Sequence, residues 1–110
     1  MSRRPYHVLL TAGAKADLED IYHYVASHES IARAEALLRS LEVAGARLTR
    51  LPERGNVPKE LQALGVNEFR EAHSGPYRIV YRVMGRAVFI HCVLDGRRDV
   101  QSLLQRRLLR

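Results

Sequence analysis

Arginine and histidine side chains on two predicted strands are the residues of this chain best suited to chemistry or to recognition. In residues 77–83 apolar odd-numbered side chains alternate with mostly basic even-numbered ones, the pattern of a strand with one buried face. A tight loop at Met84-Gly85 predicts pairing with residues 87–94 and sets His91 opposite Arg78. The outward face then has cationic and aromatic groups of a kind that binds a partner or acts on a phosphate: Arg78, Val80, Arg82, Phe89 and His91.

Apolar residues on the same outward face favour a binding surface. The predicted register sets Val80 opposite Phe89 and Arg82 opposite Ala87. An exposed Phe89 beside Val80 is more apolar surface than solubility requires, so we expect a partner to cover it. The alternative is that the arginines of this face are simply solvated.

The histidines give this surface a possible catalytic role. A histidine titrates near neutral pH, so His91 opposite Arg78 can act as a general base while the arginine stabilises negative charge on phosphorus. His73, near the predicted turn before Arg78, is a second candidate base. The alternative for each is an ordinary surface histidine, and a three-residue loop in the hairpin turns His91 to the other face.

Two further arginines follow the last predicted strand. Arg97 and Arg98 precede the predicted C-terminal helix and can cradle an anion. Asp95 and Asp99 lie beside them and can pair with them instead, an interaction worth roughly 0 to 1 kcal/mol on an exposed surface.

The composition indicates an anionic partner. The 110 residues carry a formal net charge of +6, with a pI near 10.1, which suggests binding to nucleic acid or to an acidic protein segment. All basic residues except Lys15 and Lys59 are arginines, which make planar bidentate contacts with phosphate or carboxylate. A genome rich in G and C produces the same bias, so both explanations stay open.

The chain is expected to form one cytoplasmic domain, residues 1–110. Its single cysteine, Cys92, lies in an apolar strand and predicts a small buried hydrophobe in a reducing compartment, without a disulfide. No apolar run approaches the roughly 20 residues of a membrane span, and no signal peptide is apparent. The histidines and the cysteine show no HExxH or CxxC spacing, so we expect neither a metal nor another cofactor.

Two amphipathic helices are predicted after a short strand at residues 6–11. Thr11 is suited to cap the first, whose inner face repeats at helical spacing through Leu18, Ile21, Tyr22 and Val25. Ser30 is suited to cap the second, which keeps an apolar stripe until Pro52 ends it. The two helices form a hairpin around residues 28–30.

The second half of the chain predicts three strands and a last helix. Residues 52–65 predict a loop with one possible helical turn at 61–64, followed by a weaker strand at 66–73, a turn at 74–76 and the hairpin described above. Val100, Leu103, Leu104 and Leu108 predict the final helix. The order β-α-α-β-β-β-α gives an α+β fold, a mostly antiparallel sheet of about four strands with the helical hairpin on one face. We expect the other face to be open, apart from the last helix, or covered by a partner.

Three segments in this order resemble the RelE/ParE superfamily of toxins from bacterial type II toxin-antitoxin systems: residues 14–24, 75–83 and 93–99. The resemblance covers nearly the whole chain and implies the same topology. It also implies a toxin involved in growth inhibition or plasmid stabilization, neutralised by a cognate antitoxin whose tail wraps it. RelE-like members cut mRNA on the ribosome, whereas ParE-like members poison DNA gyrase. Any operator DNA binding is expected through the antitoxin.

Matching the RelE-type catalytic residues to this chain favours the ParE-like branch. The RelE-type arginines fall on Arg78 and Arg98, which are present. The catalytic lysines fall on Phe69 and Glu71, and the C-terminal tyrosine falls on Leu104. Cleavage through a 2′-hydroxyl needs a base and an acid besides cations, so the resemblance implies a gyrase inhibitor without enzymatic activity.

Two alternatives remain open. One is a ribosome-dependent mRNA endonuclease that uses Arg78, Arg98 and either His91 or His73. The other is a family member that has lost toxicity and only binds protein or nucleic acid.

Overall fold

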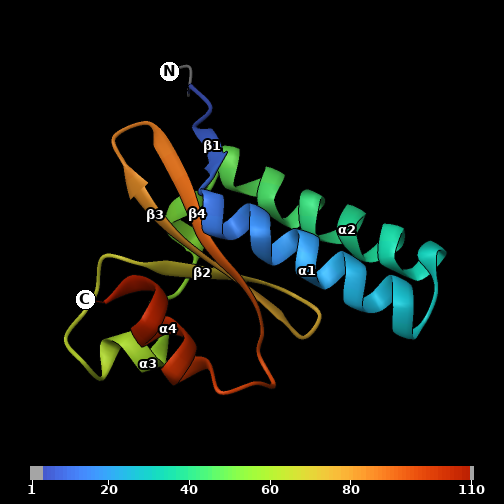
Figure 1. The fold of residues 1–110 in the computed structure, drawn as a ribbon. Coiled ribbons are helices and arrows are strands. Elements are labelled where there is room, and N and C mark those ends of the chain that lie inside the picture. Colours follow the sequence, from blue (N-terminus) through green and yellow to red (C-terminus); the bar gives the residue numbers. More distant parts are fainter. Residues whose placement is uncertain (1–3, 110) are drawn as a thin grey trace.

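One four-stranded sheet organises the molecule (Figure 1). The computed structural model describes residues 4–109. The strands are β1 (His7–Leu10), β2 (Arg70–Ser74), β3 (Tyr77–Met84) and β4 (Ala87–Asp95), in the spatial order β1-β4-β3-β2. β1 runs parallel to β4, and the other neighbours are antiparallel. The predicted α+β class and element order are confirmed.

Helices α1 (Ala12–His28) and α2 (Ile31–Ala46) form the predicted hairpin on one face of the sheet. Both predicted caps are present, because Thr11 Oγ1 accepts a hydrogen bond from the Ala14 amide at 3.2 Å and Ser30 Oγ accepts one from the Arg33 amide at 3.0 Å. Such caps satisfy amide groups that have no partner within the helix. The second helix ends earlier than predicted, and two 3₁₀ turns, Arg47–Thr49 and Pro52–Arg54, follow it.

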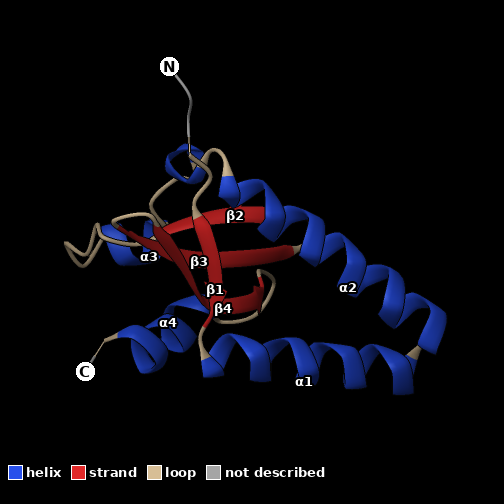
Figure 2. Cartoon of the chain, turned by 90° about the horizontal axis from the view of Figure 1, so that it is seen from above, coloured by secondary structure: helices blue, strands red, loops and turns tan. Residues whose placement is uncertain are grey.

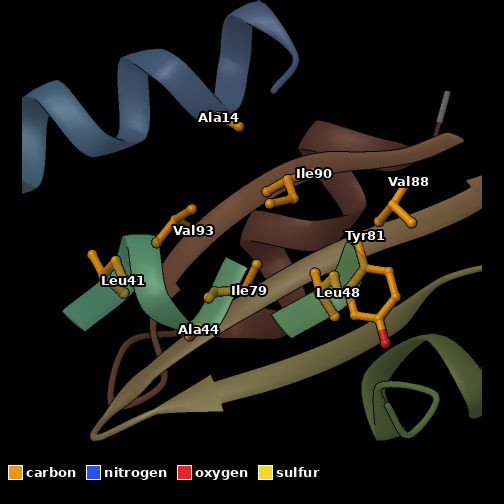
Figure 3. Packing of buried hydrophobic residues seen from close by; sticks show 9 residues of the cluster. All are labelled: Ala14, Leu41, Ala44, Leu48, Ile79, Tyr81, Val88, Ile90 and Val93. Atoms are coloured by element: carbon orange, nitrogen blue, oxygen red, sulfur yellow. The ribbon is translucent and has the colours of Figure 1, made fainter. Parts of the chain in front are cut away.

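The first hydrophobic core lies between this hairpin and the sheet (Figure 3). Its β3 members, Ile79 and Tyr81, confirm that the odd-numbered side chains of this strand point under the helices. The Tyr81 hydroxyl donates a hydrogen bond to the Pro52 carbonyl at 2.5 Å, so the deepest ring also fixes the loop after α2. The remaining core residues come from the two helices, the turn after α2 and β4: Ala14, Leu41, Ala44, Leu48, Val88, Ile90 and Val93. Tyr22 is half-buried and lies outside this cluster.

A second core fills the opposite face, which corrects the expectation that this face is open. The short helix α3 (Lys59–Gln62) and helix α4 (Val100–Leu108) cover it, on the side of the sheet away from α2 (Figure 2). Val80 is 0% exposed. Cys92 is buried here too, and burial raises the pKa of its thiol to about 11, in keeping with the predicted apolar role. The other members are Leu61, Phe69, Leu94, Val100 and Leu104.

The predicted register of the β3–β4 hairpin is wrong. The turn residues are Gly85-Arg86, so Met84 pairs with Ala87 and Arg82 pairs with Phe89. Gly85 has φ +60°, as the first central residue of a type II′ turn requires. An irregularity between Val80 and Tyr81 then shifts the pairing once more, so Arg78 lies opposite Leu94 instead of His91.

The irregularity has the form of a β-bulge with one extra residue on β4. Val80 pairs with Cys92 and Tyr81 with Ile90, which leaves His91 as the extra residue. The insertion reverses the alternation of faces along β4, but Cys92, Val93 and Leu94 after it are all apolar and are buried in one core or the other, so the reversal leaves no mark in the sequence. No helix in the described range is long and apolar enough to cross a membrane.

Candidate functional site

Arg78, the central residue of the predicted site, is held in a buried ion-pair network. Its Nη1 and Nη2 donate to the two carboxylate oxygens of Glu60 at 2.8 and 2.7 Å, and its Nε donates to Glu71 Oε1 at 2.5 Å. The side chain is only 11% exposed. Hydrogen bonding from Arg78 lowers the pKa of Glu60, and the Glu60 and Glu71 contacts raise the pKa of Arg78 despite its burial. The guanidinium is therefore surrounded by negative charge.

The two carboxylates come from separate elements beside β3. Glu60 lies on α3, and Glu71 lies on β2 opposite Val80. The second oxygen of Glu71 accepts a hydrogen bond from Asn56 Nδ2 at 2.7 Å. Sequence reasoning missed both partners. The sequence signal that could have found one of them was Glu71, an acidic residue two positions before His73, which pairs with Arg78.

His73 and His91 lie in different surroundings. His73 is the pairing partner of Arg78 across β2 and β3. Its side chain is exposed, with Nε2 3.9 Å from Glu71 Oε2. His91 is half-buried and packs edge-on against Phe69, with ring centroids 5.4 Å apart. The structure thus separates His91 from Arg78 along the sheet.

His91 is held in its neutral form. Desolvation lowers its pKa from the ordinary value of 6.5, and the nearby Arg82 and Arg107 lower it further. Arg82 and Phe89, paired across β3 and β4, are both half-buried. Three residues of the predicted outward face stay partly exposed, and we call them the Arg82 surface: Arg82, Phe89 and His91.

The two arginines after β4 differ from each other. Arg97 is bound to Asp95 through two side-chain hydrogen bonds of 2.9 and 2.8 Å, and this contact lowers the pKa of Asp95. Arg98 is exposed and makes no ion pair within the described residues. Asp99 caps α4 by accepting from the Ser102 amide at 3.2 Å. Local pairing with an aspartate is therefore observed for Arg97.

Another ion pair, between Arg107 and Asp17, joins the two ends of the chain and was not predicted. Arg107 of α4 donates to both carboxylate oxygens of Asp17 on α1, at 2.8 and 3.1 Å, and to the His91 carbonyl at 2.9 Å. The other donor to Asp17 is the Val93 amide at 2.9 Å. β1 ends opposite Ile90, so the His91 carbonyl and the Val93 amide of β4 lie beyond the end of their neighbouring strand. Arg107 and Asp17 supply hydrogen-bond partners for these two backbone groups.

The arrangement suits recognition better than proton transfer. Phe69 is 6% exposed and Leu104 is 0% exposed, and Glu71 is occupied by Arg78 and Asn56. The resemblance implied that the RelE-type catalytic lysines and tyrosine fall on these positions, and each side chain is packed or paired here. Of the predicted site residues, His73, Arg97 and Arg98 are exposed and the Arg82 surface is half-buried; these groups can bind a partner through charge and an aromatic ring.

Comparison with known proteins agrees with this fold and with the resemblance. Residues 8–100 match the family described as ParE toxin of type II toxin-antitoxin system, parDE. Toxin ParE3 of Caulobacter vibrioides is 27% identical over 100 residues, covering 91% of this chain and 96% of that protein.

Two solved structures resemble the chain. The chromosomal ParDE TA system from P. aeruginosa superposes with a TM-score of 0.68 at 19% identity, covering 80% of this chain and 92% of that one. The toxin-antitoxin complex RelBE2 from Mycobacterium tuberculosis gives a TM-score of 0.54 at 27% identity, covering 81% and 95%. The family match spans most of the sequence, and the fold is the one seen in these relatives. The chain therefore belongs to the ParE toxin family of type II toxin-antitoxin systems, within the RelE/ParE superfamily.

Proposed function

We propose that this toxin inhibits DNA gyrase by binding, without catalysis of its own, and that a cognate antitoxin neutralises it in the cytoplasm. The observation that carries the proposal is the enclosure of Arg78 by Glu60 and Glu71. RNA cleavage needs cations free to stabilise the charge that builds on phosphorus. An arginine already neutralised by two carboxylates is poorly suited to that task. Arg78 therefore stabilises the fold by joining α3, β2 and β3.

The ParE family membership supports gyrase as the target, because a gyrase-binding toxin needs a surface and no acid-base set. The surface we assign to this contact is the Arg82 surface together with Arg98. Arg97, next to Arg98 in the sequence, contributes less to the contact, because its guanidinium is already bound to Asp95. Arg78 and Val80, predicted as part of the binding face, are largely withdrawn from solvent and are not assigned to this contact.

A supercoiling assay tests the proposal. The purified toxin should inhibit supercoiling by gyrase, and its expression should induce a DNA-damage response. Replacing Arg82 and Arg98 with glutamate should relieve the inhibition, whereas Arg33→Glu, on the exposed side of α2, should leave it unchanged. Full supercoiling in the presence of excess folded toxin, with no DNA-damage response, would remove gyrase as the target.

One observation favours an endonuclease as a second candidate. His91 is held neutral beside Arg82, and a neutral imidazole next to a cation can take a proton from a 2′-hydroxyl. This alternative predicts codon-phased mRNA cuts on the ribosome. It also predicts that the double variant His73→Ala, His91→Ala loses toxicity while keeping its fold. Unchanged toxicity of that variant counts against the endonuclease.

The antitoxin partner is supported by the two solved structures that resemble this chain, a ParDE TA system and a RelBE2 toxin-antitoxin complex. Co-expression tests it directly. Growth inhibition by this chain should disappear when its cognate antitoxin is expressed, and the two should purify together. Operator DNA should be bound by the complex and not by the toxin alone.

A further inference from the structure

A pocket lined by four arginines lies at the end of the sheet where the β3–β4 hairpin turns. It encloses about 320 Å³. Its walls come from the segment before β1, the 3₁₀ turns after α2 and the turn between β3 and β4. Figure 1 shows the start of β1 and this turn at the same end of the sheet. We call it the arginine pocket, and the residues on which the argument depends are Arg4, Tyr6, Arg50, Arg54 and Arg86.

Backbone hydrogen bonds hold the three segments of the pocket together. The Tyr6 amide donates to the Thr49 carbonyl at 2.7 Å, which joins the segment before β1 to the turn after α2. The His7 amide donates to the Arg86 carbonyl at 2.8 Å, which joins β1 to the hairpin turn. The arginines are far apart in the sequence, but they extend from backbone that is already in place, so a ligand meets a preorganised site.

The Arg86 side chain has a fixed orientation in the pocket. Its Cζ lies 4.6 Å from the centre of the Tyr6 ring, and its Nη2 donates to the Arg4 carbonyl at 3.0 Å. A cation over an aromatic face is attracted to the ring. A guanidinium has five N–H donors in one plane, so these two contacts orient the group and leave further donors for a ligand.

The pocket has an excess of positive charge. Arg4, Arg50, Arg54 and Arg86 are exposed, and none of them forms an ion pair within the described residues. Glu53 is the one carboxylate among the described residues that line the pocket, so four arginines against one glutamate leave a formal charge of +3. Like charges around one hollow repel one another, and a bound anion relieves that repulsion.

A chain of phosphates is the anion that suits this lining best. Arginine binds phosphate through two parallel hydrogen bonds, and at least half of the hydrogen bonds between proteins and DNA go to the sugar-phosphate backbone. Several guanidinium groups around one hollow can hold successive phosphates of one strand. A small organic ligand fits less well, because pockets for such ligands are lined mainly by apolar and aromatic side chains, whereas charged side chains are the majority here.

The arginine pocket adjoins the Arg82 surface. Arg82 pairs with Phe89, and two residues further along β3 Met84 pairs with Ala87, the last pair before the turn that contains Arg86. A strand rises about 3.4 Å per residue, so Arg82 lies roughly 7 Å from that last pair along the strand. A partner that covers the Arg82 surface therefore has the arginine pocket at its border.

We propose that the arginine pocket binds the phosphate backbone of the DNA duplex that gyrase holds, so that the toxin contacts both the enzyme and its DNA. The inference rests on the proposed gyrase target and adds a second ligand at the border of that contact. Gyrase acts on duplex DNA, and a toxin bound to the enzyme through the Arg82 surface directs Arg50 and Arg86 toward the nearby backbone. Backbone contacts have no sequence information, so recognition of an operator still needs the antitoxin.

Affinity for purified gyrase, measured with and without a bound DNA duplex, tests the proposal. Wild-type toxin should bind the gyrase–DNA complex at least about tenfold more tightly than gyrase alone at low salt. In the double variant Arg50→Gln, Arg86→Gln most of this gain should disappear, while affinity for gyrase alone stays within about twofold of the wild type. The variant should also reduce the slope of log affinity against log salt concentration by about two, one for each lost phosphate contact.

Two further variants serve as controls. Arg50→Lys with Arg86→Lys keeps both charges and should retain most of the gain, though less than the wild type, because lysine binds phosphate only as a point charge. Arg33→Gln with Arg39→Gln removes two exposed arginines of α2 outside the pocket and should keep the whole gain. Circular dichroism should show that each variant keeps its fold.

The outcomes separate this inference from the proposed function. If wild-type toxin binds neither gyrase nor the gyrase–DNA complex, gyrase is not the target. If it binds gyrase and DNA adds no affinity, or if the glutamine variant keeps the full gain, the arginine pocket is not a DNA site and the gyrase proposal stands. If the glutamine variant loses affinity equally with and without DNA, the pocket contacts the gyrase protein, which also overturns the inference.

Discussion

Arg107, near the C-terminus, forms a two-hydrogen-bond ion pair with Asp17 of the first helix, and together they close the exposed edge of β4. Arg107 also donates to the His91 carbonyl at 2.9 Å, so three elements meet at this pair. The guanidinium lies so near the start of α1 that a Cβ on Gly13 would be 2.6 Å from its Nη2. A side chain at that position would require the Arg107 guanidinium to shift from its place beside Asp17.

Removing one member of this pair should loosen α4. In Arg107→Ala, Asp17 loses its partner and the edge of β4 opens, so we expect a loss of about 2 kcal/mol in the free energy of unfolding. Asp17→Asn should cost a similar amount. In a double-mutant cycle the two losses should fall short of additivity by about 1 kcal/mol. Urea unfolding measures these values, and Arg106→Ala serves as the neighbouring control; strict additivity would show that the pair does not couple α1 to α4.

The network around Arg78 should make stability depend on pH through Glu60. The unfolded chain protonates this carboxyl near its ordinary pKa of 4.5, whereas the Arg78 hydrogen bond lowers the folded pKa. Stability rises with pH wherever the unfolded state binds more protons. The contribution of Glu60 is therefore full above pH 4.5 and is lost as the pH falls through the lowered folded pKa.

Glu60→Gln isolates this contribution. The variant should lose about 2 kcal/mol near neutral pH, because Arg78 keeps only one carboxylate partner. The difference from wild type should shrink below pH 4.5, the value at which the unfolded carboxyl titrates. Unfolding in urea across the pH range measures it. Glu35→Gln, an exposed carboxylate on α2, is the control, and a difference that stays constant down to acid pH contradicts the assignment.

The contact between Tyr81 and the loop after α2 should show a rescue. Gly55 lies against the Tyr81 hydroxyl and the Glu71 carbonyl, so Gly55→Ala introduces a clash and should cost about 2 kcal/mol. Tyr81→Phe loses the buried hydrogen bond to Pro52 and should cost about 1 kcal/mol. The double variant removes one of the two oxygens that the new methyl meets, while the Glu71 carbonyl stays. It should therefore be more stable than the sum of the two changes indicates, and thermal unfolding of all four proteins tests this.

The sequence contains enough information for the topology and for the side of the sheet that each β3 residue faces. Periodic apolar residues and the caps Thr11 and Ser30 are local signals, and the structure confirms them. The alternation that places Ile79 under the helices and Arg78 opposite is also local.

The predicted site was wrong where its geometry depends on contacts between residues far apart in the sequence. Glu60 reaches Arg78 from a helix of four residues in a segment predicted as a loop, and Arg107 reaches Asp17 across 90 positions of the chain. The turn at Gly85-Arg86 and the bulge after it together move His91 away from Arg78. The bulge reverses the alternation of faces, but the residues that follow it, Cys92, Val93 and Leu94, are all apolar, so the reversal leaves no mark in the sequence. Charged groups at the surface of a strand can therefore be assigned to a face from sequence, but their partners cannot.

His91 should prove to be a packed, neutral side chain and not a base. Its pKa is lowered from 6.5 by desolvation, then by Arg82 and Arg107, so the unfolded chain takes up a proton before the folded protein does. Stability from this residue is full above pH 6.5, the ordinary value, and is lost as the pH falls through the lowered folded pKa. His91→Gln has no such proton to bind, so its free energy of unfolding should change less between pH 7 and about pH 5 than that of the wild type. His23→Gln, at an exposed position of α1, is the matched control. Growth inhibition by His91→Gln should fall only as far as its affinity for gyrase falls, because a binding surface needs no proton acceptor. Loss of toxicity in a folded variant whose binding to gyrase is intact would show that His91 has a catalytic role.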